Sequence, residues 1–230
     1  MSTRTVDWTA PRTPGTGRPA EGLRERKKRL MRQQLSDTAT EMFLDRGFDA
    51  VRVTEIADAC GVSEKTVFNY FPTKESLVVD LGEAVEEALR TTLADPGLEP
   101  VQAVLRILAD QLAAVTSWLA AQPDRARAVE RFRRFGTLIH STPSLRAYQR
   151  DTTERLVVVA AEVLARRADL SPWDPEPRIA ANALLGLWSI QFQELGRHLD
   201  DTRTPEELRQ AVTAQVERAA RLLDAGLRAL

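Results

Sequence analysis

Apolar residues recur every three or four positions along most of the chain, which is the spacing of one face of an α-helix. Leu35, Ala39 and Phe43 belong to the first such stripe, which ends at Gly47, a residue type common at helix C-termini. Two shorter stripes follow, one on each side of Gly61. The pattern predicts an all-α fold of about nine helices, with no convincing strand.

Longer helices are predicted for the rest of the chain. A stripe over residues 74–92 predicts a fourth helix, and residues 101–119 carry the clearest amphipathic pattern. Three later helices are predicted at Thr142-Pro143, Asp174-Pro175 and Thr204-Pro205, where a capping residue precedes a proline suited to the first helical position.

Basic residues concentrate at the start of the chain. The whole sequence is almost neutral, with 32 Lys and Arg against 33 Asp and Glu. Its first 32 residues, however, contain nine basic and three acidic side chains. A basic end on an acidic remainder favours a polyanionic partner at that end. The alternative is a solvated tail followed by a charged helix face.

Composition argues against several other classes of protein. One cysteine excludes a disulfide framework, and with only two histidines neither a metal site nor a cofactor is expected. The sequence has no glycine-rich phosphate loop, H-E-x-x-H or G-x-S-x-G motif, so we do not expect an enzyme. Its uninterrupted apolar runs are shorter than the ~18 residues of a membrane span, and no secretory signal is recognised. We expect a soluble, cytoplasmic protein with no membrane partner.

The two short stripes around Gly61 fit a helix-turn-helix, whose tight turn often contains glycine. The residues expected to pack inward are Ile56, Ala57, Val62 and Val67. The residues expected to face outward on the second helix are Lys65, Thr66, Asn69 and Tyr70. These side chains offer the donors and acceptors that base edges and phosphates require, which predicts DNA binding. The alternative is an ordinary tight corner in a helical bundle.

This region resembles the TetR family of bacterial regulators. The resemblance rests on FLDRGFDA at residues 43–50, VTEIA at 53–57 and GVSEKTVFNYFPTKE at 61–75, and it covers roughly residues 24–80. It implies a homodimer whose amino-terminal domains bind a palindromic, double-stranded DNA operator. It also implies a small-molecule effector in the larger domain, which changes the separation of the DNA-binding domains.

The resemblance further implies which side chains reach DNA. The matching positions are Thr54, Lys65, Thr66 and Asn69, with phosphate contacts at Tyr70 and Lys74. Two positions depart from the family pattern. Phe68 stands where tyrosine is common, so a hydroxyl–phosphate bond is lost. Arg52 stands where a Ser or Thr cap is common, so either it adds a charged DNA contact or the cap shifts.

The predicted organisation has three parts. Residues 1–20 form a flexible basic arm, residues 21–73 a three-helix DNA-binding domain, and residues 74–230 a ligand-binding and dimerisation domain. The arm either enters the minor groove of DNA or is a disordered extension.

Aromatic and polar side chains in the middle helices are candidates for an effector pocket, because small molecules bind in apolar cavities with a few polar groups. The candidates are Leu112, Trp118, Phe132, Phe135, His140, Trp188, Gln191 and Phe192. For most of them, ordinary core packing is the alternative. Such a pocket would suit an apolar or amphipathic effector.

The last two helices carry wide apolar faces, which predict pairing with a second copy in a four-helix bundle. The expected interface residues are Ala183, Leu187, Ile190, Leu208, Val212, Ala219, Leu223 and Leu227. The sequence therefore predicts a dimeric repressor that its effector releases from DNA. The alternative is an activator or architectural protein without a ligand switch.

Overall fold

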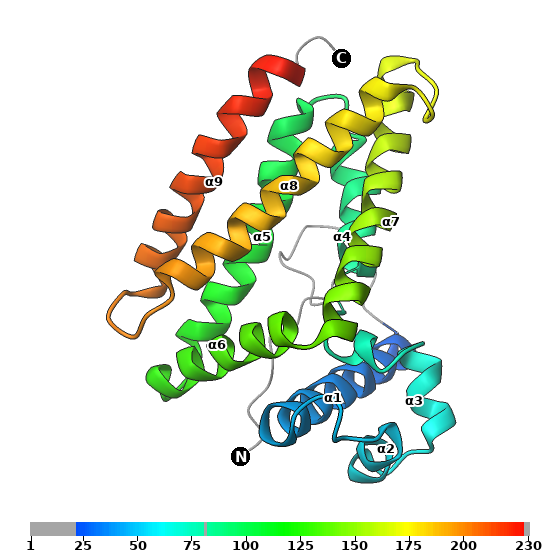
Figure 1. Cartoon of the computed structure of the whole chain (residues 1–230), viewed down its shortest axis with the longest axis vertical. Coiled ribbons are helices and arrows are strands. Elements are labelled where there is room, and N and C mark those ends of the chain that lie inside the picture. The colour runs from blue at the N-terminus through cyan, green and yellow to red at the C-terminus, as the bar shows by residue number, and fades with distance from the viewer. Residues whose placement is uncertain (1–21, 81, 228–230) are drawn as a thin grey trace. The chain divides into compact units, whose positions relative to one another are not determined.

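The computed structural model describes residues 22–80 and 82–227, with side chains as far as Asp224. These residues form nine α-helices and no strand (Figure 1), so the predicted all-α class is confirmed. The helices are α1 (Leu23–Arg46), α2 (Val53–Cys60), α3 (Glu64–Tyr70), α4 (Gly82–Ala88), α5 (Pro100–Ala120), α6 (Arg125–Ser141), α7 (Pro143–Ala168), α8 (Pro175–His198) and α9 (Pro205–Leu227).

Proline opens four of the long helices. Pro100, Pro143, Pro175 and Pro205 are the first residues of α5, α7, α8 and α9. The first N–H of a helix has no partner within the helix, so proline loses nothing at this position and supplies a helical φ angle. The start signals predicted for α7, α8 and α9 are therefore confirmed.

The single helix predicted over residues 74–92 is wrong. A 3-10 turn, η1 (Glu75–Leu77), comes first; α4 follows, and then a π-helical turn, η2 (Leu89–Leu93). Thr73 stabilises η1 from outside: its hydroxyl accepts from the Ser76 N–H, and its carbonyl accepts from the Ser76 hydroxyl. Residues 79 and 80 are not helical. The apolar spacing that predicted one helix thus continues across a break.

The chain forms two compact units. Unit 1 contains the described residues up to Asp80 together with Phe132–Gln149, and unit 2 contains residues 82–131 and those from Arg150 onward. The division differs from the predicted boundary after residue 73. Residues 74–80 belong to unit 1, and so do the second half of α6 and the start of α7.

Unit 1 is built around one apolar core. Its fully buried members on α1, α2, α3, η1 and α7 are Leu35, Ala39, Phe43, Ile56, Val67, Leu77 and Leu145, and the loop residues Val51 and Phe71 are fully buried as well. Side chains from α6, including Phe135, Leu138 and Ile139, pack against this core. Arg134 of α6 also donates to the Leu44 carbonyl at the end of α1. Residues from the second half of the chain therefore complete the core that α1–α3 begin.

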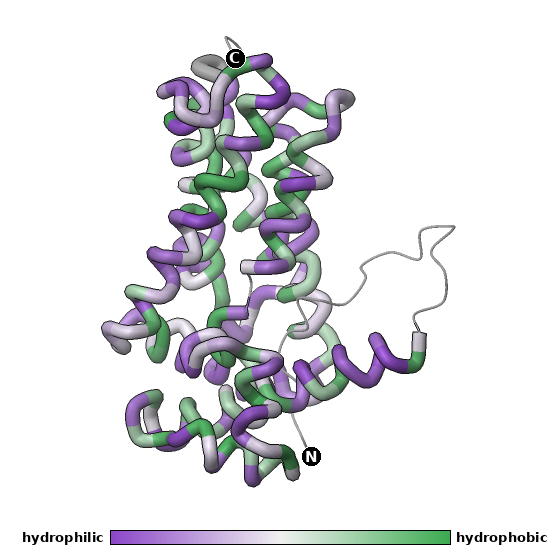
Figure 2. The backbone as a smooth tube through the Cα atoms, turned by 90° about the vertical axis from the view of Figure 1, so that its right-hand side faces the viewer, coloured by the Kyte–Doolittle hydropathy of each residue, from purple (hydrophilic) through white to green (hydrophobic). Residues whose placement is uncertain are grey.

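Unit 2 is a bundle in which α9 packs against both α8 and α5 (Figure 1). Hydrophobic and hydrophilic residues alternate along its helices (Figure 2), as expected for helices with one buried face. Arg167 of α7 donates to the carbonyls of Leu93, Asp95 and Leu98 at 2.6–2.8 Å. One side chain thereby satisfies three backbone acceptors between η2 and α5.

Helix α5 is the only described helix long and apolar enough to span a membrane by length and composition, which the short apolar runs of the sequence did not reveal. Leu108, Leu112 and Leu119 on one face are buried, whereas Arg106 and Asp110 are exposed. An apolar face buried against α8 and α9 and a charged exposed face are the features of a core helix.

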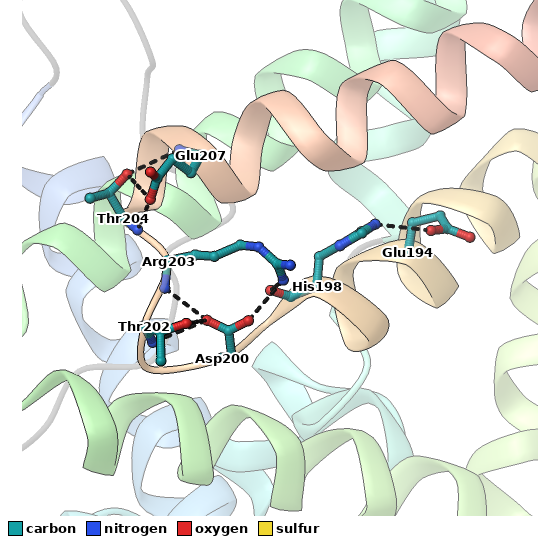
Figure 3. Close-up of polar contacts among 7 residues, drawn as sticks. All are labelled: Glu194, His198, Asp200, Thr202, Arg203, Thr204 and Glu207. Atoms are coloured by element: carbon teal, nitrogen blue, oxygen red, sulfur yellow. Dashed lines mark hydrogen bonds and ion pairs between the residues drawn. The ribbon is translucent and has the colours of Figure 1, made fainter.

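The loop between α8 and α9 is held by side chains (Figure 3). Asp200 accepts from the Thr202 and Arg203 N–H groups and from the Arg203 guanidinium. Thr204 and Glu207 form a reciprocal capping box: the Thr204 N–H donates to the Glu207 carboxylate at 2.7 Å, and the Glu207 N–H donates to the Thr204 hydroxyl at 3.2 Å. The capping box predicted for α9 is therefore confirmed.

Candidate nucleic-acid interface

The turn between α2 and α3 depends on Gly61. This residue has φ 68° and ψ 32°, a left-handed conformation that glycine adopts with little strain. Its N–H donates to the Asp58 carbonyl, and the Val62 N–H donates to the Ala57 carbonyl at 3.0 Å. These bonds end α2 and redirect the chain. Ser63 then caps α3 by accepting from the Thr66 N–H at 3.1 Å.

Buried side chains fix the orientation of both short helices. Ile56 and Val67 are completely buried and Ala57 is 2% exposed, while Val62 is half-buried against the same core. All four residues predicted to face inward therefore pack against the core of unit 1. With Val67 inside, the opposite face of α3 is directed to solvent.

That opposite face of α3 carries Lys65 and Asn69, with Phe68 at its edge, and all three are exposed. Lys65 and Asn69 are thus available to a partner, as predicted. Thr66 is only half-buried, and its hydroxyl lies 2.8 Å from that of Ser63. The geometry therefore gives Thr66 a capping contact that the sequence interpretation did not include.

The start of α2 shows how the chain accommodates Arg52. Glu55, the third residue of the helix, accepts from the Arg52 N–H at 2.9 Å and so satisfies a free donor. This N–H and the Arg46 guanidinium, 2.8 Å away, hold the pKa of Glu55 below its ordinary value. The Arg52 side chain is 82% exposed and Thr54 is exposed. Both can therefore reach a partner.

Lys74 differs from the expectation of a free phosphate contact. Its ammonium group donates to the Phe48 carbonyl at 2.6 Å and lies 4.4 Å from the centre of the Phe48 ring and 5.6 Å from that of Phe43. Burial lowers the pKa of Lys74, although nearby carboxylates oppose the shift. The ammonium group therefore stabilises the loop between α1 and α2, a role that the sequence did not predict, and its phosphate contact stays a prediction.

Arg32 was not identified from the sequence. Its Nε donates to Asp80 at 2.8 Å, a second nitrogen donates to the Tyr70 carbonyl at 2.7 Å, and its guanidinium lies 4.6 Å from the centre of the Phe71 ring. Arg32 thus links α1, the end of α3 and Asp80, three residues after the end of η1. Its partners are 38 and 48 positions away along the chain, so no local pattern indicates them.

The basic residues near the start of the chain divide into two groups. Residues 24–28 are exposed on the first turns of α1, where the tube in Figure 2 is strongly hydrophilic. The predicted basic arm, residues 1–20, lies outside the described residues.

The predicted pocket residues fall into different units. Phe132, Phe135 and His140 belong to unit 1; Phe135 packs on its core, and His140 is exposed. The candidates in unit 2 are Leu112, Trp118, Trp188, Gln191 and Phe192. Leu112, Trp188 and Gln191 are buried, Trp118 is half-buried, and Phe192 is 41% exposed. Helix α6 crosses the division between the units, which is why its residues are separated from the other candidates.

Trp188 also has a partner that the sequence did not indicate. Its Nε1 donates to the Gln111 side chain at 2.9 Å, joining α8 to α5. Gln191, one helical turn further along α8, is 7% exposed. In unit 2, polar groups therefore lie among buried apolar side chains of the middle helices.

Part of the predicted dimer interface is instead the chain's own core. Leu187, Leu208 and Val212 are at most 2% exposed, because α8 and α9 pack against each other and α9 packs against α5. Ala183, Ile190, Ala219 and Leu223 are only partly buried and keep accessible surface. The side chain of Leu227 lies outside the described part. Besides Phe192, the large exposed apolar side chains of α8 and α9 are Ile179, which is 69% exposed, and Leu222, which is 82% exposed. Neither was predicted as an interface residue.

Together, the glycine turn, the buried anchors and the exposed face of α3 define a helix-turn-helix protein. Family models extend this result. Residues 35–81 match the model for bacterial regulatory proteins of the tetR family, and residues 112–227 match the MftR C-terminal domain. The chain belongs to the TetR family of bacterial regulatory proteins.

Individual relatives agree with this assignment. The chain is 31% identical over 148 residues to the HTH-type transcriptional regulator TcmR of Streptomyces glaucescens, an alignment covering 64% of each protein. It is 29% identical over 170 residues to MftR of Mycobacterium tuberculosis, covering 74% of this chain and 81% of MftR. It is 41% identical over 90 residues to the HTH-type transcriptional activator FasR of Mycolicibacterium smegmatis, covering 34% of this chain and 41% of FasR. The matched region is therefore under two thirds of TcmR and FasR.

Proposed function

We propose that this protein is a cytoplasmic transcriptional regulator that binds a palindromic operator as a homodimer. The observation that carries the proposal is the exposed face of α3, held outward by the buried Val67 and by the glycine turn before it. A helix of this kind fits the major groove of B-DNA, with its first residues at the base edges.

The exposed side chains have chemistry suited to different parts of DNA. Asn69 can form two hydrogen bonds with adenine, and Lys65 can donate to guanine O6 or N7. Arg52 and Thr54 are exposed at the start of α2, and we assign them phosphate contacts, which fix the register of the protein without reading sequence. Tyr70 is half-buried, and its hydroxyl is the side-chain group that can donate to a phosphate, while its carbonyl accepts from Arg32.

The proposed control is release from DNA by a small apolar or amphipathic effector. Support comes from the buried Leu112, Trp188 and Gln191 and from the Trp188–Gln111 hydrogen bond of unit 2, where polar groups lie in an apolar surrounding. An effector that lowers DNA affinity must itself bind more weakly when DNA is present, and such couplings are typically about 1–3 kcal/mol.

Activation is the second candidate mode of regulation. It is favoured by the similarity to FasR, which is named an activator. DNA recognition is the same in both modes. Transcription of a reporter gene downstream of the bound sequence, with and without the protein, distinguishes a decrease from an increase.

The decisive experiment is selection of bound duplexes from a random DNA pool, followed by fluorescence anisotropy on the selected sequence. We expect a palindromic consensus. Asn69→Ala should weaken binding by about 1–3 kcal/mol per half-site and relax the preference at one base pair. Arg106→Ala, which removes an exposed charge from α5, is the matched control and should bind like the wild type. Recovery of no consensus by the wild-type protein would refute the proposal.

A further inference from the structure

The exposed face of α3 contains one large apolar side chain. Phe68 is 42% exposed, although its neighbour Val67 is completely buried. Lys65, three residues earlier, and Asn69, the next residue, are both exposed on the same face. Residues three apart on a helix are neighbours, so Phe68 lies beside Lys65, on the exposed side of α3 that also carries Asn69.

An aromatic ring in this position has a specific chemical consequence. Phenylalanine has neither a donor nor an acceptor, so Phe68 cannot hydrogen-bond to a phosphate or to a polar base edge. Its apolar surface gains free energy only when another apolar group covers it. Among the groups that bases present in the major groove, the C5-methyl of thymine is the apolar one.

We propose that Phe68 is a specificity-determining residue that packs on the C5-methyl group of a thymine in each half-site of the operator. This inference rests on the proposed function, because it needs α3 to enter the major groove. It adds a recognition element that works by apolar contact alongside the hydrogen bonds of Lys65 and Asn69. It also explains why the absence of a hydroxyl at this position need not cost affinity.

The test is a thymine-to-deoxyuridine scan of the duplex selected by the wild-type protein. Deoxyuridine removes the methyl group and leaves every hydrogen-bonding group unchanged, so the scan isolates apolar readout. Replacing the contacted thymine in a single half-site should raise the Kd about four-fold, the effect of one buried methyl-sized group. Replacing that thymine in both half-sites should raise the Kd about fifteen-fold, because separated sites add.

Variants assign the effect to Phe68. Phe68→Ala should bind the thymine and deoxyuridine duplexes equally, whereas Phe68→Leu, which keeps an apolar side chain, should retain most of the difference. Asn69→Ala is the matched control: it should lose affinity yet keep the full deoxyuridine penalty at that thymine. Circular dichroism melting shows that each variant is folded. If Phe68→Ala does not fold, Phe68→Gln, which replaces the ring with a polar amide, takes its place and should likewise bind the two duplexes equally.

The possible outcomes separate this inference from the function on which it rests. If the wild-type protein selects no consensus, the proposed function fails. If it selects a consensus but no thymine shows a deoxyuridine penalty, or Phe68→Ala keeps that penalty, only the role of Phe68 is overturned.

Discussion

Lys65 and Lys74 illustrate, at the scale of single residues, how the same side chain takes different roles. Both match family positions that contact DNA. Lys65 is exposed on α3, whereas the Lys74 ammonium donates to the Phe48 carbonyl and lies over two aromatic rings. A charged donor bonded inside a folded unit contributes to stability, and an exposed one contributes mainly to the attraction of a polyanion.

Replacing Lys74 by alanine should therefore mainly lower stability, whereas replacing Lys65 by alanine should mainly weaken DNA binding. We expect Lys74→Ala to lower the free energy of unfolding by about 1.5–3 kcal/mol, the range for hydrogen bonds that involve charged groups. Lys65→Ala should change it by less than about 0.5 kcal/mol. On DNA, Lys65→Ala should weaken binding by about 1–3 kcal/mol per half-site and relax the preference at one base pair, because its proposed contact is with a guanine. Urea unfolding and fluorescence anisotropy measure these quantities. An unchanged free energy of unfolding for Lys74→Ala would favour a DNA contact as the role of this residue.

Gly61 allows a second prediction at this scale. Nothing lies within 4 Å of a Cβ added there, so only the left-handed backbone opposes a side chain. Gly61→Ala should therefore destabilise the protein by about 1 kcal/mol, and Gly61→Asn by less, because asparagine tolerates this conformation. Thermal unfolding of the two variants tests the order. If both variants cost several kcal/mol, steric crowding rather than backbone conformation would be responsible.

At the scale of elements, the features that could be predicted from the sequence are those caused by residues close together along the chain. Helix faces, the proline starts and the Gly61 turn arise from residues a few positions apart, and the structure contains them as predicted. The break before α4 was missed because an apolar stripe continues across it. The Arg32–Asp80 contact was missed because its partners are 48 residues apart. The inclusion of residues 132–149 in unit 1 is likewise a product of tertiary packing.

The start of α7 gives a prediction about unit 1. Leu145 is completely buried in a core whose other members come mainly from the first 80 residues. Leu145→Ala should therefore destabilise the protein by about 2–5 kcal/mol, the usual cost of truncating a buried leucine. Val158→Ala on the same helix, where the side chain is 52% exposed, should cost far less. Chemical unfolding measures both. If both variants lower the free energy of unfolding by equally small amounts, the stability of unit 1 does not depend on the start of α7.

Capping of α9 should make stability depend on pH. The Thr204 N–H that donates to Glu207 is the main cause holding the pKa of this carboxyl below its ordinary value of 4.5. A carboxyl whose pKa is lower in the folded state stabilises the fold above its unfolded pKa, and this contribution is lost as the pH falls through the folded pKa. We therefore expect stability to decline with acidification below about pH 5.

Substitution identifies the contribution of Glu207. Glu207→Gln preserves the capping geometry but cannot titrate, so its stability should fall less steeply with acid than that of the wild type. Glu217→Gln, at an exposed position further along α9, serves as the control. Urea midpoints between pH 6 and about pH 3 provide the comparison. Identical acid slopes for wild type and Glu207→Gln would contradict the assignment.

At the scale of the whole molecule, burial within one chain narrows the surface available for dimerisation. Leu187, Leu208 and Val212 are used in packing α8 and α9 within unit 2. Ile179 and Leu222 remain exposed on those helices, so they are the candidates for the dimer interface in place of the buried residues. In a two-fold dimer both copies use the same surface, so each of these two residues contributes to the interface twice.

A charged residue at either of these positions should therefore separate the proposed dimer. We expect Leu222→Glu, and more strongly the double variant with Ile179→Glu, to sediment as monomers at concentrations where the wild type is dimeric, because each buried charge without a partner is costly. Val158→Glu places the same charge on an exposed apolar position of α7 and should leave the assembly unchanged. On DNA, the monomeric variants should bind a full palindrome no better than a single half-site, since the second contact becomes an independent event. A double variant that still sediments as a dimer would place the interface on another surface of the chain.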